Sequence, residues 1–184
     1  MSAPSSKPQI DGHLILVGLP GAGKTTIGRN VARKLGRPFL DFDLEIEKRS
    51  GLLVRDIFAR QGEQSFRRME QELTRELAAA PPMTLSPGGG WITNPGVVEL
   101  LRPPAKIVHL KISPAGALMR LSRSRVVRPL LAEPDPAARI QALWESRRDL
   151  YNAADLIIDV ELVDSKRVTD SIVALAHELT PGIG

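Results

Sequence analysis

The stretch GLPGAGKT, residues 18–25, constrains the fold of this chain more than any other feature. It fits the pattern G-x-x-x-x-G-K-[ST], which joins a buried strand to a helix and holds phosphate. Both flanks agree with that context: apolar residues 14–17 precede the pattern, and apolar residues recur at helical spacing after it up to Leu35. The sequence therefore predicts a strand, a glycine loop and a helix that together bind a nucleoside triphosphate. A chance glycine turn before a helix is the alternative.

The residue types of this loop fit the chemistry of phosphate. Glycines allow backbone N–H groups to curl around phosphate oxygens, helped by the positive end of the following helix. Lys24 is placed to reach the β- and γ-phosphates, and Thr25 to offer its hydroxyl to Mg²⁺. These two residues are therefore the first candidates for donor and metal binding.

The length and composition indicate one domain that needs no covalent support. The chain has 184 residues and no cysteine, which excludes disulfides and thiolate metal sites and favours a cytoplasmic protein. Residues 1–11 are polar and contain two prolines, so we expect a flexible leader before a single domain at 12–184. No apolar run approaches the roughly 20 residues of a membrane span, so we expect no membrane partner. A monomer is expected.

The net charge of +4 favours anionic partners. Much of the excess lies in residues 120–128, which contain four arginines. Because only 4% of the residues are aromatic, we expect no base-stacking platform for nucleic acid. The arginines more simply serve nucleotide phosphates, and a solvated basic face is the alternative for Arg123 and Arg125.

Short apolar runs alternate with helical patterns along the rest of the chain. This alternation predicts an α/β fold, a parallel sheet with helices on both faces. Ligands of such sheets bind beyond the carboxyl ends of the strands, so the residues that close each strand are candidate site residues. The expected strands are residues 14–17, 38–43, 83–86, 106–112 and 155–160, and the expected helical regions are 24–35, 44–80, 95–101, 114–123, 136–151 and 165–179.

Two aspartates, Asp41 and Asp43, close the second expected strand. Strand alternation places both carboxylates on one face and Phe42 on the other. Asp41 is well placed to hold Mg²⁺ directly or through water, and Asp43 to orient or deprotonate a hydroxyl of an acceptor. The alternative is that Asp43 caps the following helix.

Two further segments fit a ligand site. Residues 88–90 are consecutive glycines that let a ligand approach the backbone and use its N–H groups, and an unliganded flexible turn is the alternative. Residues 124–136 hold three prolines with little periodicity, which favours a mobile lid that carries Arg128, or an ordinary surface loop.

Two arginines on expected helices, Arg67 and Arg147, suit bidentate binding of a carboxylate. A helix-surface arginine is the usual alternative. Spacing alone does not separate them from their neighbours Arg68 and Arg148.

The chain resembles the shikimate kinases in five motifs that occur in the family's order. These are GLPGAGKT, PFLDFD, DIFARQGEQSFRRMEQE, SPGGGWI and RPLLAEP, and the resemblance covers residues 14–179. It implies a nucleoside-monophosphate-kinase-like P-loop fold with a five-stranded parallel sheet, a substrate-binding helical region at about 44–80 and a lid at about 124–136. It also implies Mg²⁺-dependent transfer of the ATP γ-phosphoryl group to the 3-hydroxyl of shikimate, in aromatic amino-acid biosynthesis.

The resemblance implies roles for individual residues on the donor side. It assigns the ATP phosphates to Gly21, Ala22, Gly23, Lys24, Thr25 and Thr26, with Arg128 of the lid on the phosphates and Arg120 beside adenine. It assigns the metal to Thr25 and Asp41. Residues 161–168 match the family poorly, so the adenine contact of this segment stays unassigned.

On the acceptor side, the resemblance makes Asp43 the ligand of the shikimate hydroxyls and the base. It assigns the shikimate carboxylate to Arg67 and Arg147, the pocket lining to Gly88, Gly89 and Gly90, and a supporting role to Glu70. The implied catalytic residues are Lys24, Asp43 and Arg128.

One departure and two alternatives accompany this interpretation. Trp91 stands where the family has a small or modest apolar residue, and its indole either packs in the core or narrows the pocket. A gluconate-kinase-like sugar-acid kinase shares the loop and the preference for a carboxylate, but GE-x-x-FR and RPLL favour shikimate. A non-catalytic ligand-sensing module would lose part of the set Lys24, Thr25, Asp41 and Asp43, whereas this chain keeps all four.

Overall fold

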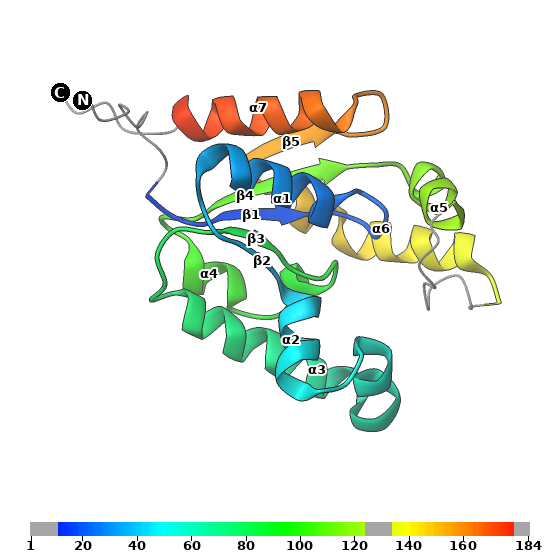
Figure 1. Ribbon diagram of the computed structural model, residues 1–184. Helices are drawn as coiled ribbons and strands as arrows, with labels where there is room; N and C mark the ends of the chain where they lie inside the picture. The colour runs from blue at the N-terminus through cyan, green and yellow to red at the C-terminus, as the bar shows by residue number, and fades with distance from the viewer. Residues whose placement is uncertain (1–10, 124–133, 179–184) are drawn as a thin grey trace, which may run out of the picture.

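A parallel sheet forms the centre of the molecule (Figure 1). The computed structural model describes residues 11–123 and 134–178, and in that part of the chain the sheet has five strands. Neighbouring strands are parallel, in the order β2-β3-β1-β4-β5. The strands are β1 (Leu14–Val17), β2 (Phe39–Asp41), β3 (Thr84–Ser86), β4 (Lys106–Lys111) and β5 (Leu156–Asp159). The predicted fold class is confirmed.

Helices cover both faces of this sheet. The helices are α1 (Lys24–Leu35), α2 (Phe42–Ser50), α3 (Val54–Leu77), α4 (Val97–Leu101), α5 (Pro114–Ser122), α6 (Pro136–Asn152) and α7 (Ser165–Glu178), with a 3-10 helix η1 (Trp91–Thr93). α1 and α7 pack side by side over one face, and α3 and α4 lie on the opposite side (Figure 1). α6 packs against β4, where the rings of His109 and Tyr151 stack with centroids 4.7 Å apart.

The central strand is apolar along its whole length because helices cover both of its faces. All four residues of β1 are buried, as expected of a parallel strand between two helical layers. α1 packs closely on β2, since a Cβ at Gly28 would lie 2.6 Å from the ring of Phe39. The carboxyl end of β1, where the glycine loop begins, therefore lies buried between the helical layers.

The second strand ends earlier than the sequence predicts, and this changes the place of Asp43. β2 stops at Asp41, and α2 begins at Phe42. The Asp41 carboxylate accepts a hydrogen bond from the Leu44 N–H at 3.3 Å and so caps α2. Asp43 lies in the first helical turn, where a negative charge is favoured. The prediction that Asp41 and Asp43 share one face of a strand is therefore wrong, as is the alternative that Asp43 is the cap.

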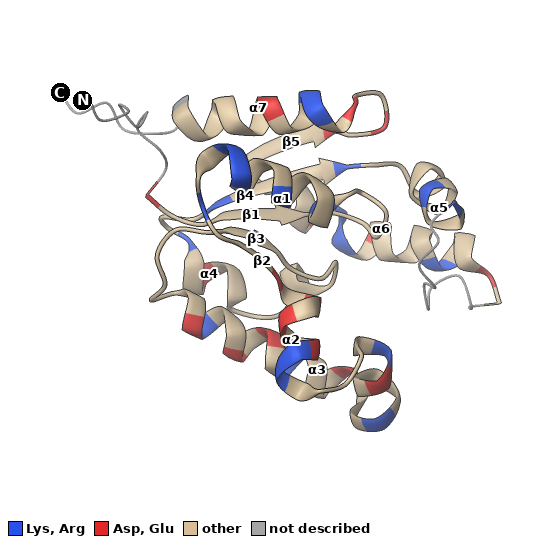
Figure 2. Ribbon diagram, in the orientation of Figure 1, with Lys and Arg blue, Asp and Glu red and all other residues tan. Residues whose placement is uncertain are grey.

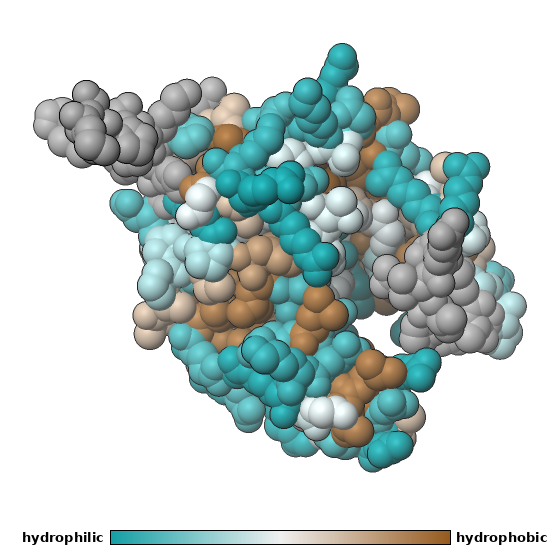
Figure 3. Space-filling view, in the orientation of Figure 1, coloured by the Kyte–Doolittle hydropathy of each residue, from teal (hydrophilic) through white to brown (hydrophobic). Residues whose placement is uncertain are grey.

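The expected helical region 44–80 consists of two helices, α2 and α3. α3 is broken at Gly62, whose φ of 78° and ψ of 164° are not helical, so residues 63–77 form a segment of their own. Apolar side chains reach the surface over α2 and α3 (Figure 3), where Leu44, Leu53 and Phe58 are exposed. Among the described residues, no helix is both long enough and apolar enough to cross a membrane.

Candidate active site

The glycine loop leaves the carboxyl end of β1 and turns directly into α1. Its glycines at 18, 21 and 23 have φ values of 147°, 86° and 90°. A Cβ at Gly18 would lie 2.6 Å from the carbonyl oxygen of Leu110 in β4, so a larger residue does not fit. Gly23 is the N-cap of α1, and the first N–H groups of the helix therefore face the loop. This geometry suits an anion at the helix N-terminus.

Lys24, the first residue of α1, folds back across the loop. Its Nζ donates hydrogen bonds to the carbonyl oxygens of Gly18 at 2.9 Å and Leu19 at 3.1 Å. The ammonium group thus adds a positive charge beside the N–H groups of the loop, which strengthens the attraction for phosphate.

Thr25 and Asp41 meet at the edge of the loop. The Thr25 hydroxyl donates a hydrogen bond to Asp41 Oδ2 at 2.7 Å. A hydroxyl and a carboxylate are hard oxygen ligands, and Mg²⁺ takes one or two such ligands while phosphate oxygens and water complete its shell. In the described part of the chain, no group of three or more His, Cys, Asp or Glu side chains could hold a metal ion. The Thr25–Asp41 pair supplies the kind and number of oxygen ligands that a phosphate-bound Mg²⁺ takes from a protein.

A cavity of about 340 Å³ opens beside the glycine loop. Arg120 lines it and donates a hydrogen bond to the carbonyl oxygen of Val160. The segment that the sequence left unassigned contributes Val163, Asp164, Ser165 and Val168 to the wall. The other lining residues are Gly21, Ala22, Gly23, Thr26, Ile27 and Val160. Its mixed wall and its place next to the loop suit the base and sugar of a nucleotide.

A second site lies on the other side of the loop, where Asp43, Glu70 and Gly88 converge. Acidic residues gather where α2 leaves the sheet (Figure 2). Asp43 Oδ1 and Glu70 Oε1 are buried and have no hydrogen-bond partner among the described residues. A Cβ at Gly88 would lie 3.0 Å from the Asp43 oxygen and 3.2 Å from the Glu70 oxygen. Two free acceptors therefore face one small space that only glycine leaves open.

Burial raises the pKa of both carboxyl groups. The pKa of Asp43 rises to about 6, because burial and the nearby Asp41 charge outweigh the opposing Lys24 charge. The pKa of Glu70 rises to about 7 through burial, against the Arg67 charge. A carboxyl whose pKa lies near neutrality is suited to take up a proton from a hydroxyl.

Arg67 in α3 is fixed by two carboxylates. It donates to Glu70 Oε2 and to Glu63 Oε1, each at 2.7 Å, and Asn94 donates to the same Glu70 oxygen at 2.9 Å. A Cβ at Gly90 would overlap the Arg67 guanidinium, so the arginine lies directly over the glycine triplet. The neighbouring Arg68 is exposed and donates to Ser65. The structure thus separates two arginines that the sequence alone does not.

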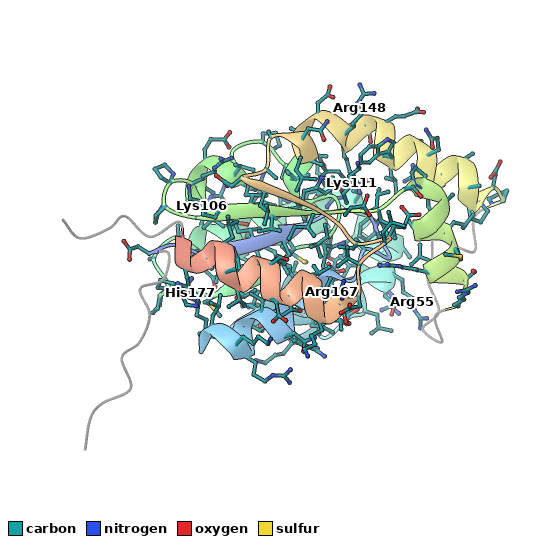
Figure 4. The ribbon with its side chains drawn as sticks, turned by 90° about the horizontal axis from the view of Figure 1, so that it is seen from above. Arg55, Lys106, Lys111, Arg148, Arg167 and His177 are labelled. Atoms are coloured by element: carbon teal, nitrogen blue, oxygen red, sulfur yellow. The ribbon has the colours of Figure 1, made fainter. Side chains whose placement is uncertain are left out.

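Arg147 of α6 reaches the same glycines from another direction. It is buried, and a Cβ at Gly89 would lie 3.1 Å from its Nη1. The Tyr151 hydroxyl donates to the Gly89 carbonyl oxygen at 3.0 Å, a contact that no sequence pattern predicted. Arg148, by contrast, points outward from α6 (Figure 4) and pairs with Asp149. Arg67 and Arg147 together make a positive clamp over the glycine triplet.

The structure decides between the two alternatives for Trp91, but it does not describe Arg128. Trp91 is fully buried and packs in the core against Phe42, with ring centroids 6.2 Å apart, so the core alternative holds. Arg128 and most of the expected lid lie outside the described residues. The structure also assigns partners to Glu70 that spacing did not reveal, because Asn94 lies 24 positions away in the chain.

The comparisons with known proteins agree on one family. The family model described as shikimate kinase matches residues 20–176. The shikimate kinase of Mycobacterium tuberculosis (strain ATCC 25177 / H37Ra) is 47% identical over 137 residues, which cover 74% of this chain and 77% of that protein. The shikimate kinase of Mycobacterium marinum is 42% identical over 168 residues, which cover 91% and 90%.

Solved structures agree with the sequences. The shikimate kinase of Acinetobacter baumannii, solved in complex with shikimate, matches with a TM-score of 0.83 and 34% identity, over 91% of this chain and 93% of that chain. A gluconokinase from Sinorhizobium meliloti matches with a TM-score of 0.63 and 17% identity, over 94% and 95%. The second likeness shows a shared fold only.

Proposed function

The chain belongs to the shikimate kinase family and is an ATP-dependent shikimate kinase, and we propose how its residues carry out the transfer. The γ-phosphoryl group of ATP passes to the 3-hydroxyl of shikimate. The gluconate-kinase-like and sensing-module alternatives are not favoured, because family model and relatives are shikimate kinases and the gluconokinase shares only the fold.

The donor binds at the glycine loop. The N–H groups of residues 21–26 hold its phosphates, and Lys24 neutralises charge on the β- and γ-phosphates. The base occupies the cavity between Arg120 and Val168. Support comes from the N-terminus of α1 and from this cavity, which lie next to each other on one edge of the sheet.

Thr25 and Asp41 hold Mg²⁺ in this proposal, in agreement with the hydroxyl and carboxylate oxygens that meet there. When bound at these two oxygens, Mg²⁺ would supply positive charge that offsets the negative charge of the ATP phosphates. Asp41 also caps α2, so its carboxylate is fixed before any ligand arrives.

Shikimate binds at the glycine triplet. Arg67 and Arg147 clamp its carboxylate, and Gly88, Gly89 and Gly90 leave room for its ring. Asp43 accepts a hydrogen bond from the 3-hydroxyl and takes up its proton as the hydroxyl oxygen bonds to the γ-phosphorus. The bond between the γ-phosphorus and the β,γ-bridging oxygen breaks in the same step, and ADP leaves with that oxygen. The observation that carries this assignment is the buried Asp43 oxygen beside Gly88, which has no hydrogen-bond partner among the described residues, while Arg67 and Arg147 contact the other two glycines of the triplet.

The domain organisation is a proposal that rests on the family resemblance. Residues 12–184 form one kinase domain, in which α2 and α3, within about 44–80, hold the acceptor. Residues 124–136 act as a lid whose Arg128 reaches the ATP phosphates and excludes water. From composition, we also propose a cytoplasmic protein without nucleic-acid or membrane partners, and we propose that it acts as a monomer.

One assay tests the proposed function. ADP release is followed with ATP and Mg²⁺ in the presence of shikimate, gluconate, quinate or no acceptor. We expect release to depend on shikimate, and phosphorus NMR of the product to place the phosphate on the 3-hydroxyl. Equal rates with and without shikimate, or a product phosphorylated elsewhere, would contradict the proposal.

A further inference from the structure

We propose that Trp91 is a positioning residue that fixes Asp43 and Arg67 relative to each other, and this proposal rests on the acceptor site assigned above. Trp91 follows the glycine triplet directly and begins η1. Its side chain is fully buried, so it does not touch a ligand in the pocket. It nevertheless contacts each of the three segments from which that pocket is built.

The first contact reaches α3 through hydrogen bonds. The indole Nε1 of Trp91 donates to Thr74 Oγ1 at 2.9 Å. The Thr74 hydroxyl donates in turn to the backbone carbonyl oxygen of Glu70 at 2.6 Å. Glu70 holds the Arg67 guanidinium at 2.7 Å. The indole is therefore bonded to the turn of α3 that orients the carboxylate-binding arginine.

The second contact reaches α2 through packing. The rings of Trp91 and Phe42 meet edge to face, with an interplanar angle of 71°. Phe42 is fully buried and lies between Asp41 and Asp43 in the chain. A change in the position of this ring moves the first turn of α2, and with it the Asp43 carboxylate.

The third contact holds the glycine triplet. The backbone N–H of Trp91 donates to the carbonyl oxygen of Gly88 at 3.0 Å. Gly88 faces the Asp43 and Glu70 oxygens that have no hydrogen-bond partner within residues 11–123 and 134–178. Trp91 thus connects the glycine triplet to α2, which carries Asp43, and to α3, which carries Arg67.

The contacts of Trp91 are important for the position of Arg67 because the helical backbone of α3 is interrupted before the turn that carries Arg67. The break at Gly62 separates residues 63–77 from the start of the helix. Lateral contacts, among them the bond to Trp91, therefore orient the segment that carries Arg67. A misplacement of about 1 Å in a catalytic site can cost roughly 100-fold in rate.

The test uses variants that remove the hydrogen bond between Trp91 and Thr74 from either side. Trp91→Phe keeps an aromatic ring but loses the N–H donor and part of the buried indole. Thr74→Val keeps the branched shape but loses the hydroxyl, and with it the bonds to Trp91 and to the Glu70 carbonyl oxygen. Thr169→Val is the matched control. The buried Thr169 hydroxyl of α7 donates to the Ser165 carbonyl oxygen at 2.6 Å. The Thr74 hydroxyl makes the same kind of bond to the Glu70 carbonyl oxygen, also at 2.6 Å. Thr74→Ser keeps the hydroxyl and serves as the rescue variant.

We expect Trp91→Phe and Thr74→Val each to lower kcat/KM for shikimate by about threefold to tenfold while KM for ATP stays unchanged, a loss in the range of neutral buried hydrogen bonds. The double variant should lose less than the product of the two single losses, because both single variants remove the shared bond between Trp91 and Thr74. Thr74→Ser should behave as wild type, and Thr169→Val should keep the wild-type kcat/KM for shikimate.

Normal kcat/KM in Trp91→Phe and Thr74→Val would overturn the proposal, as would an equal loss in Thr169→Val. Equal changes in KM for shikimate and for ATP would also overturn it, because they would indicate a general loss of structure. Wild-type enzyme assayed in parallel keeps this result distinct from the proposed function, which fails only if the wild type itself shows no shikimate-dependent turnover.

Discussion

Asp43 and Glu70 direct two carboxylate oxygens at the same glycine, Gly88, although they lie on different helices. Neither oxygen has a hydrogen-bond partner among the described residues. Such oxygens are costly in a folded protein without ligand, and they become acceptors for hydroxyl groups when a substrate enters. The site therefore lowers the stability of the ligand-free protein and provides two acceptors for substrate hydroxyl groups.

Asp43→Asn should stabilise the protein at neutral pH. The pKa of Asp43 rises from 3.8 to about 6 on folding, so its stabilising contribution is present below pH 3.8 and lost as the pH rises through about 6. A difference of this size corresponds to ~3 kcal/mol in the free energy of unfolding. Denaturant unfolding should show a more stable variant at pH 8 and a smaller difference near pH 4. Equal stability at both pH values would contradict the raised pKa.

The rate should fall in mild acid. Asp43 must be ionised to accept a proton, so we expect kcat/KM for shikimate to decline below pH of about 6. Glu47→Gln should move this decline to lower pH, because the Glu47 charge raises the pKa of Asp43. Glu45→Gln, on the same helix, is the control and should leave the profile unchanged. A profile that Glu47→Gln does not move would count against Asp43 as the titrating group.

Arg67 and Arg147 should differ from their exposed neighbours. Arg67→Ala and Arg147→Ala each remove a charge-assisted bond to the shikimate carboxylate, worth about 1.5–3 kcal/mol, so KM for shikimate should rise roughly tenfold to 100-fold. Arg68→Ala and Arg148→Ala remove arginines of the same helices that lie at the surface, and should change KM by less than about twofold. A larger effect on KM for ATP than for shikimate would contradict the carboxylate assignment.

His109 should make the protein sensitive to acid. It is buried in β4, and burial lowers its pKa to about 4. The unfolded chain takes up the proton near pH 6.5 while the folded chain does not, so stability is present above pH 6.5 and falls as the pH drops toward 4. We expect wild type to lose roughly 2 kcal/mol more than His109→Phe between pH 7.5 and pH 5. If denaturant titration showed that wild type and His109→Phe lose equal stability between these pH values, the lowered pKa of His109 would be contradicted.

The sequence was sufficient for the fold and insufficient for the contacts inside the acceptor site. The loop 18–25 and the helix after it follow from local pattern, and α1 has the predicted bounds. Asp43 was misplaced because the Asp41 side chain caps a helix that begins at Phe42, an effect that strand alternation does not contain. Asn94 and Glu70, or Trp91 and Thr74, are 24 and 17 positions apart and meet only through tertiary packing. No periodicity or motif in a single sequence reveals such pairs.

The most direct measurement is shikimate-dependent ADP release by purified Asp43→Asn, with binding of ATP and shikimate measured on the same sample. If Asp43 orients and deprotonates the acceptor hydroxyl, the turnover rate should fall about 100-fold or more while ATP still binds with wild-type affinity. A turnover rate close to that of the wild type would contradict the assignment of Asp43 as the base, and with it the account of the acceptor site.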